Sequence, residues 1–247
     1  MPRSNRCRAA GACALALVLS LSLTATALAK GTQASLRVVG KGGKILTEQT
    51  LKTGTTSIKT SRKADCFGAG SGGSGASVSV RGATALGLLA QAAKKTASLQ
   101  PLLVTDAFDF GLGICGVGGS TVHGKASWYL KVDHKGSQVS GDATKLRPGD
   151  EVLWDLAPSY PYPNELSLEA PKTASAGVPF VVHVVSYDEK GKRKPVAGAT
   201  VTGASAPTAA DGSATVTVMG PTLLRATHGK EIPSAGVCVG GACSSGS

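Results

Sequence analysis

The chain is poor in aromatic and in acidic residues. Phe, Trp and Tyr together make up 4% of its 247 residues, and 26 lysines and arginines face only 15 aspartates and glutamates. Because large rings are so few, those present must either fill a core or form a binding surface. The H-E-x-x-H and G-x-S-x-G motifs are also absent, which argues against a zinc metalloprotease and an α/β-hydrolase. The sequence therefore predicts a protein that is not an enzyme.

Long apolar runs are absent beyond the first 29 residues. Within those, three arginines precede an apolar run at 14–23, and the sequence A-L-A at 27–29 matches a cleavage site. This order predicts a signal peptide at 1–29. The run is too short for a membrane span, which needs about 20 residues, and no later segment is apolar enough for one. We therefore expect a secreted, extracellular protein, with association with the cell wall as an alternative.

Cysteine is scarce as well. Removal of the signal peptide would leave four of the six cysteines, namely Cys66, Cys115, Cys238 and Cys243. An even number in an oxidising compartment predicts two disulfides, for which three pairings exist. We favour Cys66–Cys115 and Cys238–Cys243, because each pair then falls within one predicted domain. The alternative is a four-thiolate zinc site, but only Cys238 and Cys243 are close in sequence, and their spacing is loose. We expect no metal.

The mature chain is strongly basic. Without residues 1–29 it has 23 basic and 15 acidic residues, a net charge of +8, which favours anionic partners. The basic residues are scattered apart from a cluster at 190–194, and no aromatic residues alternate with them as a nucleic-acid platform requires. We expect no nucleic-acid partner. An anionic cell-wall polymer is a candidate partner, and a solvated surface is the simpler interpretation.

Residues 30–157 predict a small α+β domain. Thr84 can cap a helix that runs to about residue 96, because apolar residues recur along one face and two lysines stand in its last turn. Short strands precede and follow this helix, so that it would cover one face of a sheet. The strands are predicted at 34–40, 44–51, 77–80, 102–105, 127–132 and 151–156.

The sequence after residue 157 predicts a stiff linker followed by an all-β domain. Proline alternates with tyrosine and serine at 158–164, which favours an extended spacer. No helical pattern follows. Short strands recur at regular intervals with turn residues between them, as in a β-sandwich. This domain would span 165–247, with strands at 166–169, 179–187, 196–201, 213–219 and 222–227.

Residues 35–156 resemble the transcobalamin-like C-terminal domain family of exported bacterial proteins. The resemblance lies in T-A-L-G-L-L at 84–89, W-Y-L-K-V at 128–132 and K-L-R-P-G-D-E-V-L-W at 145–154. It implies a β-grasp-like fold, with one helix on a mixed sheet. Because the family includes vitamin B12 carriers, it also implies a corrinoid or other tetrapyrrole as ligand, and no other cofactor. The chain lacks the large helical domain of those carriers.

Residues 165–240 are similar to bacterial immunoglobulin-like modules. This similarity rests on P-V-A-G-A-T-V at 195–201 and A-D-G-S-A-T-V at 210–216. Such modules space or present other domains, so the similarity implies a sandwich fold and no chemistry.

The aromatic residues of the middle of the chain form the candidate ligand site. Trp128 and Tyr129 are neighbours on a predicted strand, so their side chains must point to opposite faces, and one of them leaves the core. The nearby glycine loop at 111–116 matches G-x-G-x-x-G but opens no helix, which argues against a nucleotide site. A stacking surface for a flat or sugar-like ligand is one interpretation, and a core or domain interface is the other. The candidate residues are Phe108, Phe110, Trp128, Tyr129, Tyr160 and Tyr162.

These observations predict a secreted, non-enzymatic binding protein that captures a corrinoid or other small ligand. The alternative is a wall-associated structural or adhesive module without a small ligand. A third hypothesis is a secreted hydrolase that uses Asp106 or Asp109, which stand beside the phenylalanines. Carboxylates in turns and at strand ends are more commonly structural.

Overall fold

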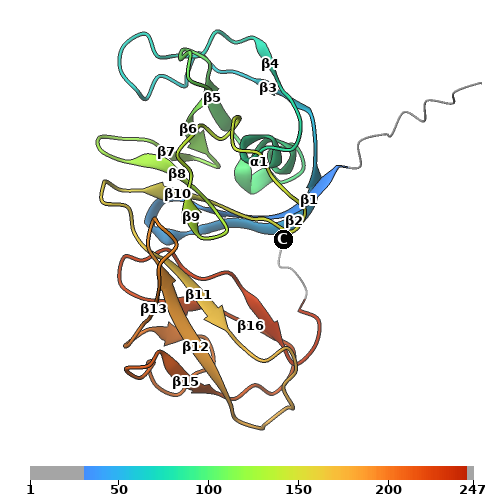
Figure 1. Ribbon diagram of the computed structural model, residues 1–247, viewed down its shortest axis with the longest axis vertical. Helices are drawn as coiled ribbons and strands as arrows, with labels where there is room; N and C mark the ends of the chain where they lie inside the picture. Colours follow the sequence, from blue (N-terminus) through green and yellow to red (C-terminus); the bar gives the residue numbers. More distant parts are fainter. Residues whose placement is uncertain (1–30, 244–247) are drawn as a thin grey trace, which may run out of the picture. The chain divides into compact units, whose positions relative to one another are not determined.

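A computed structural model describes residues 31–243 of the chain (Figure 1). The predicted signal peptide at 1–29 lies outside the described residues. None of the helices in the described part is both long enough and apolar enough to cross a bilayer. Gly31 onward forms one compact unit that contains two separate hydrophobic cores, the first built from residues up to Trp154 and the second from residues after Glu165.

A five-stranded sheet forms the base of the first core. Its order is β2-β1-β10-β8-β9, and the pairing of β1 with β10 is parallel, whereas the other pairs are antiparallel. Alternation along the strands directs Leu36, Val38 and Trp154 to the core and the residues between them to the opposite face. The strands are β1 (Thr32–Val39), β2 (Ile45–Thr53), β8 (Ser127–Val132), β9 (Lys135–Gly136) and β10 (Glu151–Ala157).

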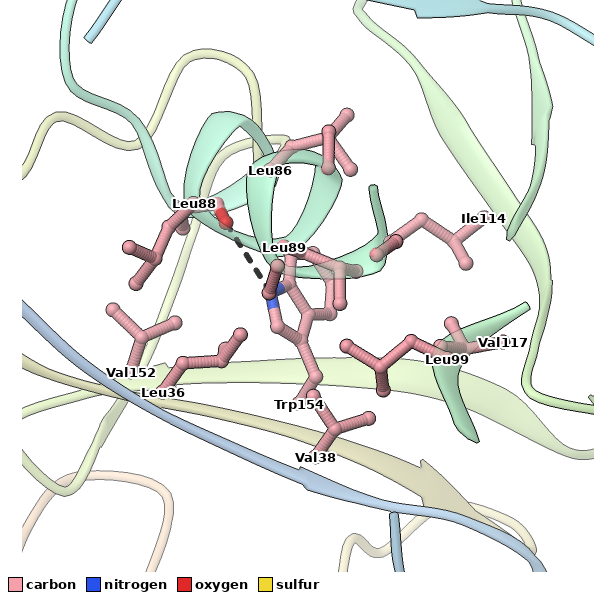
Figure 2. Packing of buried hydrophobic residues seen from close by; sticks show 14 of the residues in the cluster. Leu36, Val38, Leu86, Leu88, Leu89, Leu99, Ile114, Val117, Val152 and Trp154 are labelled. Atoms are coloured by element: carbon pink, nitrogen blue, oxygen red, sulfur yellow. Dashed lines mark hydrogen bonds between the residues drawn. The ribbon is translucent and has the colours of Figure 1, made fainter. Parts of the chain in front are cut away.

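The helix α1 (Ala85–Ala93) covers this sheet (Figure 1). Thr84 caps it as predicted, because its hydroxyl accepts a hydrogen bond from the backbone N–H of Gly87 at 3.0 Å. The helix ends earlier than expected, since Thr96 already has extended backbone angles. Trp154 lies beneath it, and its indole Nε1 donates to the carbonyl of Ala85 at 3.5 Å (Figure 2). The predicted strands at 77–80, 102–105 and 127–132 are confirmed.

Two smaller sheets enclose the other side of the helix. β3 (Thr56–Lys59) pairs with β4 (Ser77–Val80), and β5 (Leu102–Thr105) pairs with β6 (Gly113–Val117), which also pairs with β7 (Ser120–Thr121). The short 3-10 helices η1 (Lys41–Gly43) and η2 (Ala97–Leu99) turn the chain at the end of β1 and after α1. The predicted disulfide Cys66–Cys115 is present and joins the loop after β3 to β6.

The second core lies among three small sheets. β12 is central to the largest and pairs with β11, β13 and β15. The predicted disulfide Cys238–Cys243 is present at the end of the described residues. The strands are β11 (Glu165–Glu169), β12 (Phe180–Tyr187), β13 (Arg193–Pro195) and β15 (Ser213–Val216), with the two-stranded pairs β14 (Thr200–Val201) with β17 (Ala226–Thr227) and β16 (Thr222–Leu224) with β18 (Val237–Val239).

The predicted fold class, α+β with a β-grasp-like domain followed by an immunoglobulin-like sandwich, is wrong. The chain is mostly β, with 40% strand, 7% helix and a single α-helix among the described residues. Its strands form one five-stranded sheet, one four-stranded sheet and several sheets of two or three strands. Gly198 and Gly212, both at positive φ, lie in the turns before strands β14 and β15. The predicted strands at 196–201 and 213–219 are shortened to two and four residues.

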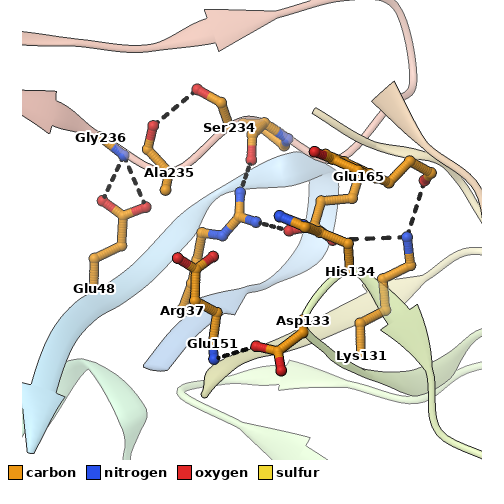
Figure 3. Close-up of polar contacts among 12 residues, drawn as sticks. Arg37, Glu48, Lys131, Asp133, His134, Glu151, Glu165, Ser234, Ala235 and Gly236 are labelled. Atoms are coloured by element: carbon orange, nitrogen blue, oxygen red, sulfur yellow. Dashed lines mark hydrogen bonds and ion pairs between the residues drawn. The ribbon is translucent and has the colours of Figure 1, made fainter. Parts of the chain in front are cut away.

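A buried carboxylate joins the two cores. Glu165, the first residue of β11, forms an ion pair with Arg37 of β1, and its Oε2 lies 3.7 Å from Lys131 Nζ and 3.2 Å from His134 Nδ1 (Figure 3). Burial alone would raise the pKa of Glu165, but His134, Arg37 and Lys131 hold it below its ordinary value. Glu165 is therefore a buried anion whose partners all come from the first core's sheet.

A second ionic contact reinforces this junction. Arg225 donates to both carboxylate oxygens of Glu48 on β2, at 2.9 and 2.6 Å. The backbone N–H of Gly236 also approaches Glu48 (Figure 3). Val39, Leu153 and Ile232 form a small apolar cluster between these contacts.

We expect Glu165→Gln to destabilise the fold by about 3–5 kcal/mol, because it removes the anion that compensates two buried cations. The matched control is Glu169→Gln, in which the lost partner is Arg193 on the surface. That change should cost no more than about 1 kcal/mol. Urea unfolding of the wild type and the two variants measures the free energy of unfolding of each. An equal loss of stability in Glu165→Gln and Glu169→Gln would contradict a central role for Glu165.

The two disulfides should contribute unequally to stability. They close loops of 49 and 5 residues, which in the chain-entropy account correspond to about 4 and about 2 kcal/mol. Replacement of Cys66 and Cys115 by serine should therefore lower the free energy of unfolding about twice as much as the same change at Cys238 and Cys243. Equal losses in urea titrations would contradict this order.

Candidate functional site

The neighbours Trp128 and Tyr129 leave β8 on opposite faces, as their strand positions require. Trp128 is half-buried and packs against the first core together with Leu130. Tyr129 points to the other face, where its register partner on β10 is Asp155. The residue that leaves the first core is therefore Tyr129.

Tyr129 meets the tyrosines of the linker. Its ring stacks on Tyr162 with the centroids 3.9 Å apart and the planes 20° apart. Tyr160 in turn contacts Tyr162 edge to face at 5.6 Å, and 73% of Tyr160 is exposed. The segment between β10 and β11 thus carries two rings to the edge of the sheet.

The phenylalanines form a second aromatic row. Phe108 lies between Phe67, at 5.4 Å in an edge-to-face contact, and Phe110, at 5.0 Å in a stacked contact. Phe110 is 78% exposed. Phe67 was missing from the predicted site. Its position next to Cys66 was a usable signal, because the predicted disulfide to Cys115 brings it to the glycine loop.

The two rows meet at one pocket of about 350 Å³, which we call the aromatic pocket. Phe67, Trp128, Tyr129 and Tyr162 all line it. Phe108, Phe110 and Tyr160 do not line it but belong to the rows that continue from it. The remaining lining is mixed: Leu112, Gly113, Ile114, Ser127, Leu130, Ser137, Gln138, Val139, Ser140, Gly141, Trp154 and Glu189.

Three polar atoms of the pocket residues have no hydrogen-bond partner among the described residues. They are Trp128 Nε1, the Tyr129 hydroxyl and Ser140 Oγ, and all three are buried. Such atoms are rare in native structures, because leaving one unpaired costs about 1–3 kcal/mol. Burial, together with the nearby Glu189, raises the pKa of Tyr129 to about 12, so its hydroxyl stays protonated and can donate. The pocket thus combines flat faces for stacking with unused donors.

The two aspartates beside the phenylalanines have separate surroundings. The carboxylate of Asp106 accepts hydrogen bonds from Ser74, from its N–H at 2.7 Å and its hydroxyl at 2.6 Å, which hold the pKa of Asp106 below its ordinary value. Asp106 therefore anchors the serine- and glycine-rich loop. Asp109 is exposed.

The glycine loop leads into strand β6 rather than a helix, and the described residues hold no cluster of three or more metal-ligating side chains.

Asp155 is a buried acid that sequence reasoning missed. It lies on the face of β10 that also carries Leu153, beside Arg37 and Lys131. Burial raises its pKa from 3.8 to about 7, although Arg37 and Lys131 act in the opposite direction. Its position within the apolar run at 151–156 was visible in the sequence, but its burial depends on residues far away in the chain.

Comparisons with protein-family models, with curated proteins and with solved structures found no match.

The raised pKa of Asp155 predicts a pH-dependent stability. Between about pH 4 and about pH 7 the unfolded chain ionises this group while the folded chain keeps it protonated, so this group lowers stability as the pH rises. An asparagine at this position cannot ionise. The stability of Asp155→Asn relative to the wild type should therefore grow with pH by at most about 4 kcal/mol. A difference in Tm that stays constant from acid to neutral pH would show that Asp155 ionises normally.

Proposed function

We propose that this protein binds a small ligand with a flat or sugar-like face in the aromatic pocket, without catalysis. The observation that carries this proposal is the convergence of Phe67, Trp128, Tyr129 and Tyr162 on one pocket. These residues come from a loop, a strand and the segment after β10, and the lining residues Trp128, Tyr129 and Ser140 carry buried polar atoms that have no partner among the described residues. Concave sites with aromatic walls and few polar groups are typical of small-molecule binding.

The pocket is at the small end of the usual range for ligand sites, which is about 300–1,000 Å³. One ring of a ligand fits within it. A larger ligand would extend over the exposed rings of Phe110 and Tyr160, which continue the two aromatic rows. A corrinoid or other tetrapyrrole, the ligand class implied by the resemblance of residues 35–156, would have to bind in this way. The two disulfides support a role outside the cell.

The loss of a hydroxyl in the aromatic pocket should lower ligand affinity without lowering the stability of the fold. Tyr129→Phe and Ser140→Ala each remove a buried hydroxyl that has no partner among the described residues, so the fold should be as stable as the wild type or more so. If the same hydroxyls hold a ligand, affinity should fall about three- to tenfold for each hydrogen bond lost. The control is Tyr160→Phe, which removes a hydroxyl from an exposed tyrosine outside the pocket lining and keeps the ring on which a larger ligand would stack.

Tryptophan fluorescence is a direct readout because Trp128 and Trp154 both line the pocket. We would titrate the protein with cobalamin, cobinamide, haem and a set of cell-wall oligosaccharides. Saturable binding of one of them that weakens in Tyr129→Phe but not in Tyr160→Phe is the expected result. Absence of binding to every probe, or equal affinity in all variants, would rule out the aromatic pocket as the site for these ligands.

A further inference from the structure

A second cavity lies where the two cores meet, which we call the interface cleft. Its volume is about 630 Å³, larger than that of the aromatic pocket. The walls come from the end of β10 and nearby loops of the first core, and from the loop at 227–233 of the second. Much of the wall is apolar, with Leu156, Pro158, Pro163, Ile232 and Pro233.

Asp155 is the buried acid of this cleft. It is among the lining residues, it is only 4% exposed, and its Oδ2 has no hydrogen-bond partner among the described residues. A buried carboxylate oxygen without a donor is costly, because it has lost its water without replacement. The protein therefore holds an unused acceptor in the wall of an apolar cavity.

The nearby cations are engaged elsewhere. Arg37 donates to Glu165 and to the carbonyl of Pro233. Lys131 donates to the carbonyls of Tyr187 and Asp188, at 3.0 and 3.2 Å. Neither forms a hydrogen bond with Asp155 within the described part of the chain. They act on it through their charge only, and the interface cleft is the cavity that Asp155 lines.

We propose that the interface cleft binds an organic ammonium ion, whose N–H groups donate to Asp155 while its apolar body lies against Leu156 and Ile232. A carboxylate is an acceptor and pairs best with a charged donor. An anion would be repelled by Asp155. A metal ion needs several oxygen, nitrogen or sulfur ligands, and no cluster of three candidate ligands occurs in the described residues.

The other charged groups of the cleft lie in its loops. Lys41 and His123 come from the first core's side, and Lys230 and the paired His228 and Glu231 come from the second. The two lysines are exposed, and salt screens their repulsion of a cation. Arg37, Lys131 and Glu165 do not line the cleft but act on Asp155 through their charges. Among the residues that line the cleft, Asp155 is therefore the fully buried acid, and Glu165 outside the lining is held by Arg37, Lys131 and His134.

Affinity for the ammonium ion should rise with pH. Burial raises the pKa of Asp155 to about 7, and its protonated form has no charge to offer. Binding should therefore strengthen from about pH 5.5 to about pH 8. Because histidine side chains generally change charge in this range, the same titration in His123→Gln and His228→Gln separates their contribution.

The test compares three probes of one size by calorimetry and NMR: benzylammonium, benzyl alcohol and benzoate. Benzylammonium should bind saturably, and the other two at least about tenfold more weakly. Asp155→Asn, which keeps the shape of the side chain, should weaken benzylammonium at least about tenfold. The control Asp211→Asn also removes one aspartate charge, but from an exposed turn. It should leave the affinity for benzylammonium unchanged.

A steric variant tests the cleft independently of Asp155. Ala126 lines the cleft, so Ala126→Leu should weaken benzylammonium while leaving Asp155 intact. Binding that is equal for ammonium and alcohol, unchanged in Asp155→Asn, or absent altogether would overturn the proposal. The aromatic pocket is a separate cavity, so each of these results leaves the proposed function open to its own titration.

Discussion

The buried carboxylate of Glu165 is the interaction on which the arrangement of the two cores depends. It collects Arg37, Lys131 and His134 from the sheet of the first core. Lys131 follows Tyr129 by two positions on β8, and Asp155 is the register partner of Tyr129 on β10. Tyr129, which lines the aromatic pocket, and Asp155, which lines the interface cleft, therefore share one sheet face with Lys131, whereas Trp128 and Trp154 line the aromatic pocket from the opposite face.

The strained turn between β8 and β9 serves the same junction. Asp133 and His134 have φ values of 48° and 66°, a region that favours glycine and costs other residues about 1–3 kcal/mol. The turn places the His134 ring parallel to Tyr187 at 3.9 Å and beside Glu165. The Asp133 carboxylate accepts from the N–H of Glu151 at 2.9 Å. The turn is therefore held by one contact within the first sheet and by two contacts with the second core.

Local features of the sequence predicted local features of the structure. The cap at Thr84 and the strand at 127–132 were correct because each depends on neighbouring residues. Both disulfides were correct because each pair was assigned within one predicted domain. Of the six aromatic residues predicted for the site, Trp128, Tyr129 and Tyr162 line the aromatic pocket, whereas Phe108, Phe110 and Tyr160 do not. Phe67 was missed although the predicted disulfide of the adjacent Cys66 pointed to it. The fold class was wrong because the described chain is mostly β, with its strands divided among several small sheets and a single helix.

The sequence by itself indicated the helix, most of the strands, four cysteines for two disulfides and the aromatic residues at the middle of the chain. Tertiary structure alone decided which residues are buried charges and which line cavities. Arg37 and Glu165 are 128 positions apart, and Asp155 is buried only because the second core covers its side of the sheet. The physical reason is that desolvation and ion pairing depend on what packs against a residue, and no local pattern specifies such distant neighbours.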